Sequence, residues 1–194
     1  MEQLKERIRR EGKVLPGNII KVDGFLNHRV DPQLLNDIAD EFAKFFDVSK
    51  ISVVLTAEAS GIALATVCAQ RYGVPMLFAK KAKSDNIESG LYQSEVYSYT
   101  YKKKVTLLVS QEWLHADDHV LIVDDFMANG FAMQGLVDIV NAAGATLEGI
   151  GVAVEKGFQG GGDKFRSMPG VRYKALAVIE QAGEDGFFFR DDEE

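Results

Sequence analysis

The fold class of this chain is decided by one stretch, Val120-Leu121-Ile122-Val123-Asp124-Asp125-Phe126-Met127-Ala128-Asn129-Gly130. Its four leading apolar residues predict a buried strand that ends on two adjacent carboxylates. A loop of mostly small residues follows. Apolar residues at helical spacing then predict a helix from about Phe131 to Ala143, which stops at Gly144. This succession of strand, acidic pair, loop and helix suits a ligand that carries both hydroxyls and a phosphate.

The loop after the acidic pair has two features of a phosphate site. Four of the five residues from Ala128 to Ala132 are small, so the backbone can approach a ligand closely. The helix behind the loop presents unpaired amides and the positive end of its dipole. Asp124 and Asp125 would repel a phosphate, but they accept hydrogen bonds from neighbouring hydroxyls such as those of a ribose. Together these features predict a site for a ribose 5-phosphate.

The remainder of the chain alternates short apolar strands with helices, which implies a mainly parallel sheet covered by helices. Ligands of such sheets bind at the carboxyl ends of the strands. The loops after Leu55, Ala79 and Val123 are therefore expected to meet in one cleft. The strands are predicted at Ile51–Leu55, Pro75–Ala79, Gly149–Glu155 and Tyr173–Ile179, the helices at Glu2–Glu11, Asp31–Phe46 and Ile62–Tyr72, and an antiparallel hairpin at Leu91–Tyr99 and Val105–Trp113.

Composition narrows the class of protein. A chain of 194 residues favours a single domain, and a net charge of −7 argues against a nucleic-acid partner bound through many phosphates. The one cysteine, Cys68, lies in an apolar helical run and is predicted to be a small buried residue. The N-terminus is charged and no apolar run approaches the roughly 20 residues that span a bilayer, so we expect no membrane association and a cytoplasmic setting.

The opening stretch resembles the phosphoribosyl diphosphate (PRPP) motif of type I phosphoribosyltransferases, and its variant is similar to that of the bacterial xanthine phosphoribosyltransferases. The likeness covers nearly the whole chain. It departs from most of the wider family in the phosphate loop, where threonines and a paired glycine are replaced by Ala128-Asn129-Gly130-Phe131. Further similar segments are Lys21–His28, Ala59–Ala63, Val74–Lys81 and Gly149–Lys156.

The resemblance implies an α/β fold of the type I phosphoribosyltransferase kind, with a mainly parallel sheet flanked by helices. Residues 1–194 would form a single domain with a small hood built from about residues 1–30 and 157–194. It also implies a homodimer. The basic connection Lys102–Lys104 of the predicted hairpin is interpreted as a mobile flap over the site.

The resemblance further implies a glycosyltransfer in purine salvage, in which xanthine and PRPP give xanthosine 5′-monophosphate and diphosphate. The sequence has no dense cage of carboxylates, so no resident metal is expected, and Mg²⁺ would arrive with PRPP. The assigned catalytic residues are Asp124 and Asp125, which would hold the ribose hydroxyls and help stabilise the cationic ring. The 5′-phosphate is assigned to Ala128, Asn129, Gly130, Phe131 and Ala132, and the pyrophosphate to Ser60, Gly61, Lys80 and Lys81, with Lys80 or Lys81 reaching the pyrophosphate of a neighbouring subunit.

Three residues are assigned to the base by the same resemblance: Ile20, Asn27 and Lys156. Lys156 carries hydrogen-bond donors only, so it favours a carbonyl or N7 of the purine and leaves the amino group of adenine unpaired. Asn27 is expected to donate to the second carbonyl of xanthine. Guanine shares the carbonyl at C6, so a phosphoribosyltransferase for guanine or hypoxanthine stays open as an alternative. A regulator that senses PRPP is the alternative from outside enzyme chemistry.

Overall fold

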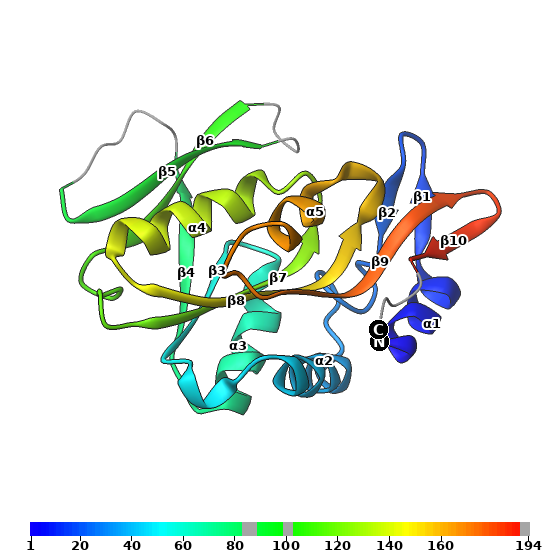
Figure 1. The fold of residues 1–194 in the computed structure, drawn as a ribbon. Coiled ribbons are helices and arrows are strands. Elements are labelled where there is room, and N and C mark those ends of the chain that lie inside the picture. The colour runs from blue at the N-terminus through cyan, green and yellow to red at the C-terminus, as the bar shows by residue number, and fades with distance from the viewer. Residues whose placement is uncertain (83–88, 99–102, 191–194) are drawn as a thin grey trace.

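The computed structural model describes residues 1–82, 89–98 and 103–190. Its main sheet has eight strands in the order β10-β9-β8-β7-β3-β4-β6-β5 (Figure 1). The central pairings β9–β8, β8–β7, β7–β3 and β3–β4 are parallel, and the outer ones are antiparallel. These strands are β3 (Val53–Ala57), β4 (Met76–Ala82), β5 (Leu91–Ser98), β6 (Lys103–Ser110), β7 (His119–Met127), β8 (Thr146–Lys156), β9 (Tyr173–Gly183) and β10 (Gly186–Phe189).

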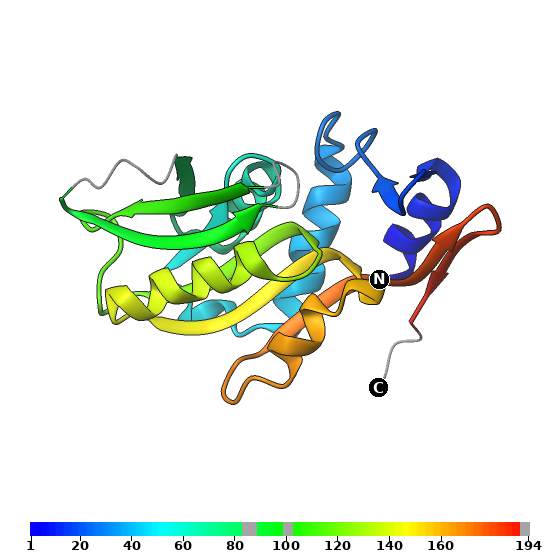
Figure 2. The same ribbon diagram turned by 90° about the horizontal axis from the view of Figure 1, so that it is seen from above.

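Helices cover both faces of this sheet, as the alternating pattern predicts. Figure 1 shows α2 and α3 below the sheet and α4 above it, and Figure 2 shows the β5–β6 hairpin beside α4. The mainly parallel α/β architecture is confirmed. The helices are α1 (Glu2–Glu11), α2 (Pro32–Phe45), α3 (Gly61–Tyr72), α4 (Phe131–Ala143) and α5 (Gly161–Arg166), with short 3-10 turns at Val48–Lys50 and Gly157–Gln159.

The connections place the ligand-binding edge between β3 and β7. From β3 the chain crosses through α3 to β4 on one side, and from β7 it crosses through α4 to β8 on the other. Where two crossover connections leave neighbouring strands toward opposite edges of the sheet, a crevice forms at the carboxyl ends of those strands. The loops that leave β3 and β7 are the ones that carry the predicted pyrophosphate and ribose-phosphate residues.

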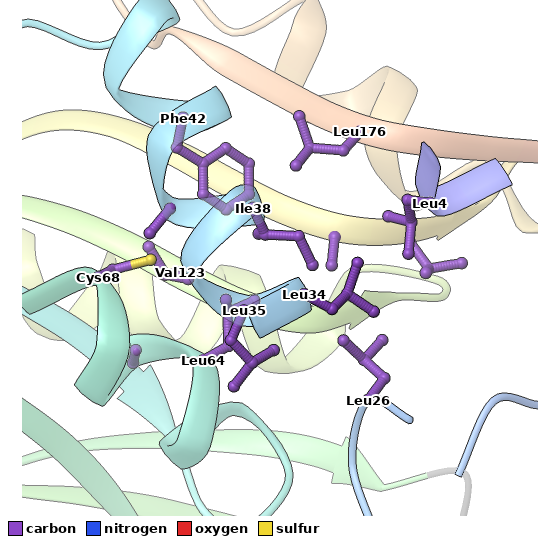
Figure 3. Close-up of a cluster of buried hydrophobic side chains, with 14 of the residues drawn as sticks. Leu4, Leu26, Leu34, Leu35, Ile38, Phe42, Leu64, Cys68, Val123 and Leu176 are labelled. Carbon is purple, nitrogen blue, oxygen red and sulfur yellow. The ribbon is translucent and has the colours of Figure 1, made fainter. Parts of the chain in front are cut away.

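The hydrophobic core is divided by the sheet into two clusters. One lies on the side of α2 and α3 and includes Phe42, Leu64 and Val123 (Figure 3). The other lies between the sheet, α4 and the β5–β6 hairpin, where a Cβ on Gly135 would lie 2.9 Å from Leu107. Strand β7 contributes to both clusters because its alternate side chains point to opposite faces.

Cys68 lies fully buried in the first cluster, as predicted, and burial raises the pKa of its thiol to about 12. The thiolate is the reactive form of cysteine, so we expect native protein to resist a disulfide reagent. After unfolding in denaturant, one thiol per chain should react. Spectroscopic counting of released thiol checks this, and fast labelling of the native chain would contradict it.

Several strands are longer or shifted relative to the predictions, including β6, β8 and β9 as well as the strands that lead to the site. β3 begins at Val53 rather than Ile51 and runs to Ala57, whereas β4 and β7 continue past Ala79 and the acidic pair. Hydrogen-bonded neighbours cause the extension, because Met127 pairs with Glu155 and the end of β4 pairs with β6. The polar residues that follow Ala79 and Val123, which were predicted to lie in loops, therefore belong to strands β4 and β7.

The same extension affects two lysine clusters. Lys80 and Lys81 belong to β4, and Lys103 and Lys104 open β6, so the predicted flap is partly strand. Its remaining residue, Lys102, lies outside the described residues. The predicted hairpin itself is confirmed by a continuous antiparallel register from Leu91↔Ser110 to Ser98↔Lys103.

The two ends of the chain pack together at one side of the sheet. Figure 1 shows α1 beside β9, β10 and the two-stranded ribbon of β1 (Lys13–Leu15) and β2 (Ile19–Lys21). The terminal amine of Met1 donates to the Leu176 carbonyl at 2.6 Å, and the Arg9 guanidinium lies 4.9 Å from the Phe189 ring centroid. In the described residues, no helix is long and apolar enough to cross a membrane.

Candidate active site

A pocket of about 180 Å³ lies where β7 passes into α4. The loop Ala128–Ala132 lines this pocket together with Asp124 and Lys81. Gly130 takes a left-handed conformation (φ 81°) just before α4, a conformation that glycine adopts without a steric penalty. The first backbone amides of α4 thus border the pocket, as expected for an anion-binding loop.

The β5–β6 hairpin closes another side of this pocket with Val96, Tyr97 and Val105. The rings of Tyr97 and Phe131 meet edge to face, with centroids 6.5 Å apart. The hairpin therefore contacts the predicted phosphate loop, Ala128–Ala132, directly. Periodicity in the sequence predicts this hairpin but not the element on which it packs.

The two carboxylates of the acidic pair have different surroundings. Asp124 is partly exposed and lines the pocket. Burial, followed by the neighbouring charge of Asp125, raises the pKa of the Asp124 carboxyl well above its usual range. A carboxylate that is incompletely solvated in this way is stabilised in its charged form by a cation or a hydrogen-bond donor in the pocket.

Asp125 is only 3% exposed and holds two distant segments together. Its carboxylate oxygens accept hydrogen bonds from Asn27 Nδ2 at 2.6 Å and from Ser60 Oγ at 2.9 Å. The predicted base residue and the predicted pyrophosphate residue thus meet on one carboxylate. Of the acidic pair, Asp124 is the one that faces the pocket.

The loop between β3 and α3 passes beside Asp124. Gly61 begins α3, and a Cβ on it would lie 2.5 Å from Asp124 Oδ1 and under 3.0 Å from Thr56 Oγ1. Only glycine fits here without displacing a neighbour. The Glu58 side chain accepts from the Lys81 amide at 2.6 Å, which ties this loop to β4. Glu58 is a site-ordering residue that the sequence did not indicate.

Lys80 and Lys81 are both exposed, but they are neighbours on a strand and so point to opposite faces. Lys81 lines the pocket, and its charge acts on the Asp124 carboxyl. Between these two candidates, the structure favours Lys81 for this pocket.

Lys156 ends β8 next to the pocket. Its Nζ lies 5.5 Å from the ring centroid of Phe126, which also lines the pocket, and burial lowers the pKa of its amine. Phe126 was missed as a site residue, because an aromatic residue after an acidic pair resembles ordinary core. Ile20, by contrast, is 6% exposed and packs in the first core cluster, so its predicted contact with a base remains a prediction.

Comparisons with known proteins agree with this geometry. A sequence profile of the phosphoribosyl transferase domain matches residues 30–167. The chain is 48% identical over 187 residues to the xanthine phosphoribosyltransferase of Lachnoclostridium phytofermentans, covering 96% of each chain. It is 50% identical over 181 residues to the xanthine phosphoribosyltransferase of Bifidobacterium longum, covering 93% of each.

Solved structures share the fold at lower identity. Adenine phosphoribosyltransferase from Rhodothermus marinus superposes with a TM-score of 0.74 at 17% identity, covering 92% of this chain and 100% of the other. The Trypanosoma brucei adenine phosphoribosyltransferase complex with AMP, pyrophosphate and ribose-5-phosphate gives 0.70 at 21% identity, covering 90% and 79%. The fold, the loop geometry and the matching sequence profile together show one family. The chain belongs to the phosphoribosyltransferase family, and the bacterial xanthine phosphoribosyltransferases are its relatives at 48–50% identity.

Proposed function

We propose that this chain is a xanthine phosphoribosyltransferase of purine salvage, a glycosyltransferase of the pentosyl class. One observation carries the choice of base: the amine of Lys156 lies over Phe126, at the edge of the pocket that contains Asp124 and the phosphate loop. A flat purine that packs near this ring would meet a group with donors only. An oxo-purine offers acceptors to such a group, and adenine offers an amino group instead. The names of the 48–50% identical relatives support the same base.

The reaction transfers the phosphoribosyl group from pyrophosphate to the purine. N9 of xanthine bonds to C1′ of the sugar as the bond from C1′ to the pyrophosphate oxygen breaks. Pyrophosphate leaves with the bonding electrons, and the purine gives up one imidazole proton. The chain's contribution is to position the reactants and to stabilise charge.

Three groups of residues would hold PRPP. The amides of Ala128–Ala132 hold the 5′-phosphate, and the 13-residue helix α4 directs its positive end at them. Asp124 accepts from the ribose hydroxyls and faces the positive charge that develops on the ring. Ser60 and Gly61, at the start of α3, hold the pyrophosphate, and Lys81, which lines the pocket, supplies a cation.

The residues present fit a Mg²⁺ ion that travels with the substrate. Among the described residues, no group of three or more His, Cys, Asp or Glu could form a metal cage. Mg²⁺ is commonly bound by one or two carboxylates plus substrate phosphates, and Asp124 supplies one carboxylate at the pocket. When bound, the ion neutralises charge on the pyrophosphate. The proposal includes a homodimer working in the cytoplasm, in which the hood (about residues 1–30 and 157–194) brings Asn27 to the base.

Asn27 has a narrower role here than the sequence indicated. One of its amide hydrogens is engaged with Asp125. Within the described ranges, no other hydrogen bond of this side chain is observed, so we assign its second amide hydrogen and its carbonyl oxygen to the base. We therefore propose that Asp125 fixes the amide orientation with which Asn27 meets xanthine.

A panel of bases tests the proposed function. With PRPP and Mg²⁺, kcat/KM should be highest for xanthine, lower for guanine and hypoxanthine, and negligible for adenine. Absorbance change on nucleotide formation gives the rates. A higher kcat/KM for guanine or hypoxanthine would establish the alternative enzyme, and no turnover of any base would favour a PRPP-sensing protein.

Lys156→Met should lower kcat/KM for xanthine by about 10- to 100-fold, since a charged hydrogen bond contributes roughly 1.5–3 kcal/mol. The loss should be specific to the base, with KM for PRPP little changed. Lys174→Met is the matched control, because Lys174 lies on β9 with its amine 5.6 Å from the Phe45 ring centroid. Equal losses in both variants would argue against recognition by Lys156.

A further inference from the structure

The short helix α5 packs against the phosphate loop from outside the pocket. The Gly161 amide donates to the Ala128 carbonyl at 3.1 Å, and a Cβ on Gly161 would lie 2.7 Å from Gly130 N. Phe165, which is fully buried, lies so close that a Cβ on Gly130 would be 3.0 Å from its ring. The position of the loop is therefore set by the position of α5.

Helix α5 is itself held by one buried carboxylate, that of Glu155. Glu155 has no exposed surface, and Arg166 donates to both of its oxygens, at 2.9 and 2.5 Å. The Tyr173 hydroxyl donates to the same carboxylate at 2.8 Å. A buried carboxylate needs such partners, because an unpaired one is strongly destabilising.

Helix α5 and two aromatic rings pack closely around this carboxylate. A Cβ on Gly162 would lie under 3.0 Å from both Glu155 oxygens, so α5 rests directly on the carboxylate. The Arg166 guanidinium lies 4.9 Å from the Tyr173 ring centroid, and Phe165 stacks on that ring at 6.3 Å. Burial and then the charge of Glu155 raise the pKa of the Tyr173 phenol, so it stays a hydrogen-bond donor.

The cluster is connected to both halves of the candidate site. Glu155 pairs with Met127 in the sheet, one residue before the phosphate loop, and Lys156 follows it directly in the chain. The C-terminal segment also contacts this cluster through Arg190. Asp163 accepts hydrogen bonds from Arg166 at 2.8 Å and from Arg190 at 3.2 Å. One rigid group of side chains thus fixes the loop for the phosphate and the lysine for the base relative to each other.

We propose that Arg166 and Tyr173 are positioning residues: through Glu155 and α5 they hold the phosphate loop and Lys156 at the separation that aligns the two substrates. Neither residue lines the pocket. Their effect on turnover arises from alignment, because small displacements of reacting groups slow a reaction steeply. This inference rests on the proposed function.

Tyr173→Phe tests the inference with the smallest change, the loss of one hydroxyl. The expected result is a fall of about tenfold in kcat/KM, with KM raised for both PRPP and xanthine. Arg166→Met should lower kcat/KM further, by about 100-fold, because the Glu155 carboxylate loses its cation. Arg166→Lys should restore part of the activity, since it returns the charge without the two-pronged geometry.

Tyr72→Phe is the matched control. The Tyr72 hydroxyl on α3 donates to the Ala39 carbonyl at 2.7 Å, on the face of the sheet away from α5, so this substitution also removes one hydroxyl and one partly buried hydrogen bond. Both variants should lose similar thermal stability, but Tyr72→Phe should keep wild-type KM values. Equal kinetics in the two variants would overturn the inference. Failure of the wild-type protein to turn over any base would instead reject the proposed function.

Discussion

Asp124→Asn should lower kcat by about 100-fold or more, a loss typical of removing a group that stabilises transition-state charge. The substitution keeps the shape of the side chain and removes its negative charge. Because Asp124 faces the pocket beside the phosphate loop, we expect the bound sugar to lose both a hydroxyl acceptor and a stabilising charge. Initial rates with saturating xanthine and PRPP measure the effect.

The same substitution should stabilise the folded protein at neutral pH. The folded chain raises the pKa of Asp124 above its ordinary value of 3.8, so it retains a proton that the unfolded chain loses. Folding stability therefore falls as pH rises through the interval between these two pKa values and stays reduced above it. Asparagine does not ionise, so the variant does not lose this folding stability as the pH rises.

Thermal melts of wild type and Asp124→Asn across pH check this sign. The variant should match wild type near about pH 4 and exceed it above the folded pKa, by about 3 °C for each roughly 1 kcal/mol in a domain of this size. The exposed carboxylate Asp117 gives the control Asp117→Asn, which should change neither activity nor the pH dependence. An inactive variant that is also less stable at neutral pH would show structural damage instead.

The local pattern of the sequence predicts the elements well because each depends on near neighbours. The apolar run before Asp124, the glycine after α4 and the proline after Asp31 all act within a few residues. The Asp31 side chain accepts from the amides of Gln33 and Leu34, as its position before Pro32 predicts. Parallel β-α alternation then restricts where the ends of β3 and β7 can meet.

Contacts between distant residues were beyond such reasoning. The hydrogen bond from Asn27 to Asp125 spans 98 positions, and no periodicity in the sequence relates the two. The strand ends at Ala82 and Met127 depend on which neighbour supplies the hydrogen bonds. The sequence contains the glycine run Gly160–Gly162, but the close packing that requires Gly161 and Gly162 involves Ala128 and Glu155, which approach the run only in the fold.

The second large effect is expected from adding a single methyl group at Gly61. Gly61→Ala would bring a Cβ 2.5 Å from Asp124 Oδ1 and under 3.0 Å from Thr56 Oγ1. Both neighbours are short side chains on β3 and β7, so they cannot swing away as a long side chain would. We expect kcat/KM to fall by about 100-fold as Asp124 or the start of α3 is displaced. Steady-state kinetics with varied PRPP give the measurement.

A matched control separates the clash from the general effect of replacing glycine. Gly183 on β9 has no positive φ, and a Cβ there would meet nothing within 4 Å. Gly183→Ala should therefore leave kcat/KM within about twofold of wild type, in line with ordinary surface substitutions. Comparable losses at both positions would mean that backbone flexibility, rather than space beside Asp124, limits the enzyme.

Thr56 offers a direct test of the cause. Its Oγ1 is buried and has no hydrogen-bond partner among the described residues, so Thr56→Ala should cost little stability by itself. In the Gly61→Ala background it removes one of the two clashing oxygens, and part of the lost kcat/KM should return. Alanine also has a higher helix propensity than glycine, by about 1 kcal/mol, so α3 is not weakened by the exchange. A double variant no better than Gly61→Ala would locate the whole effect at Asp124, which would make the separation between Gly61 and that carboxylate the constraint on this turn.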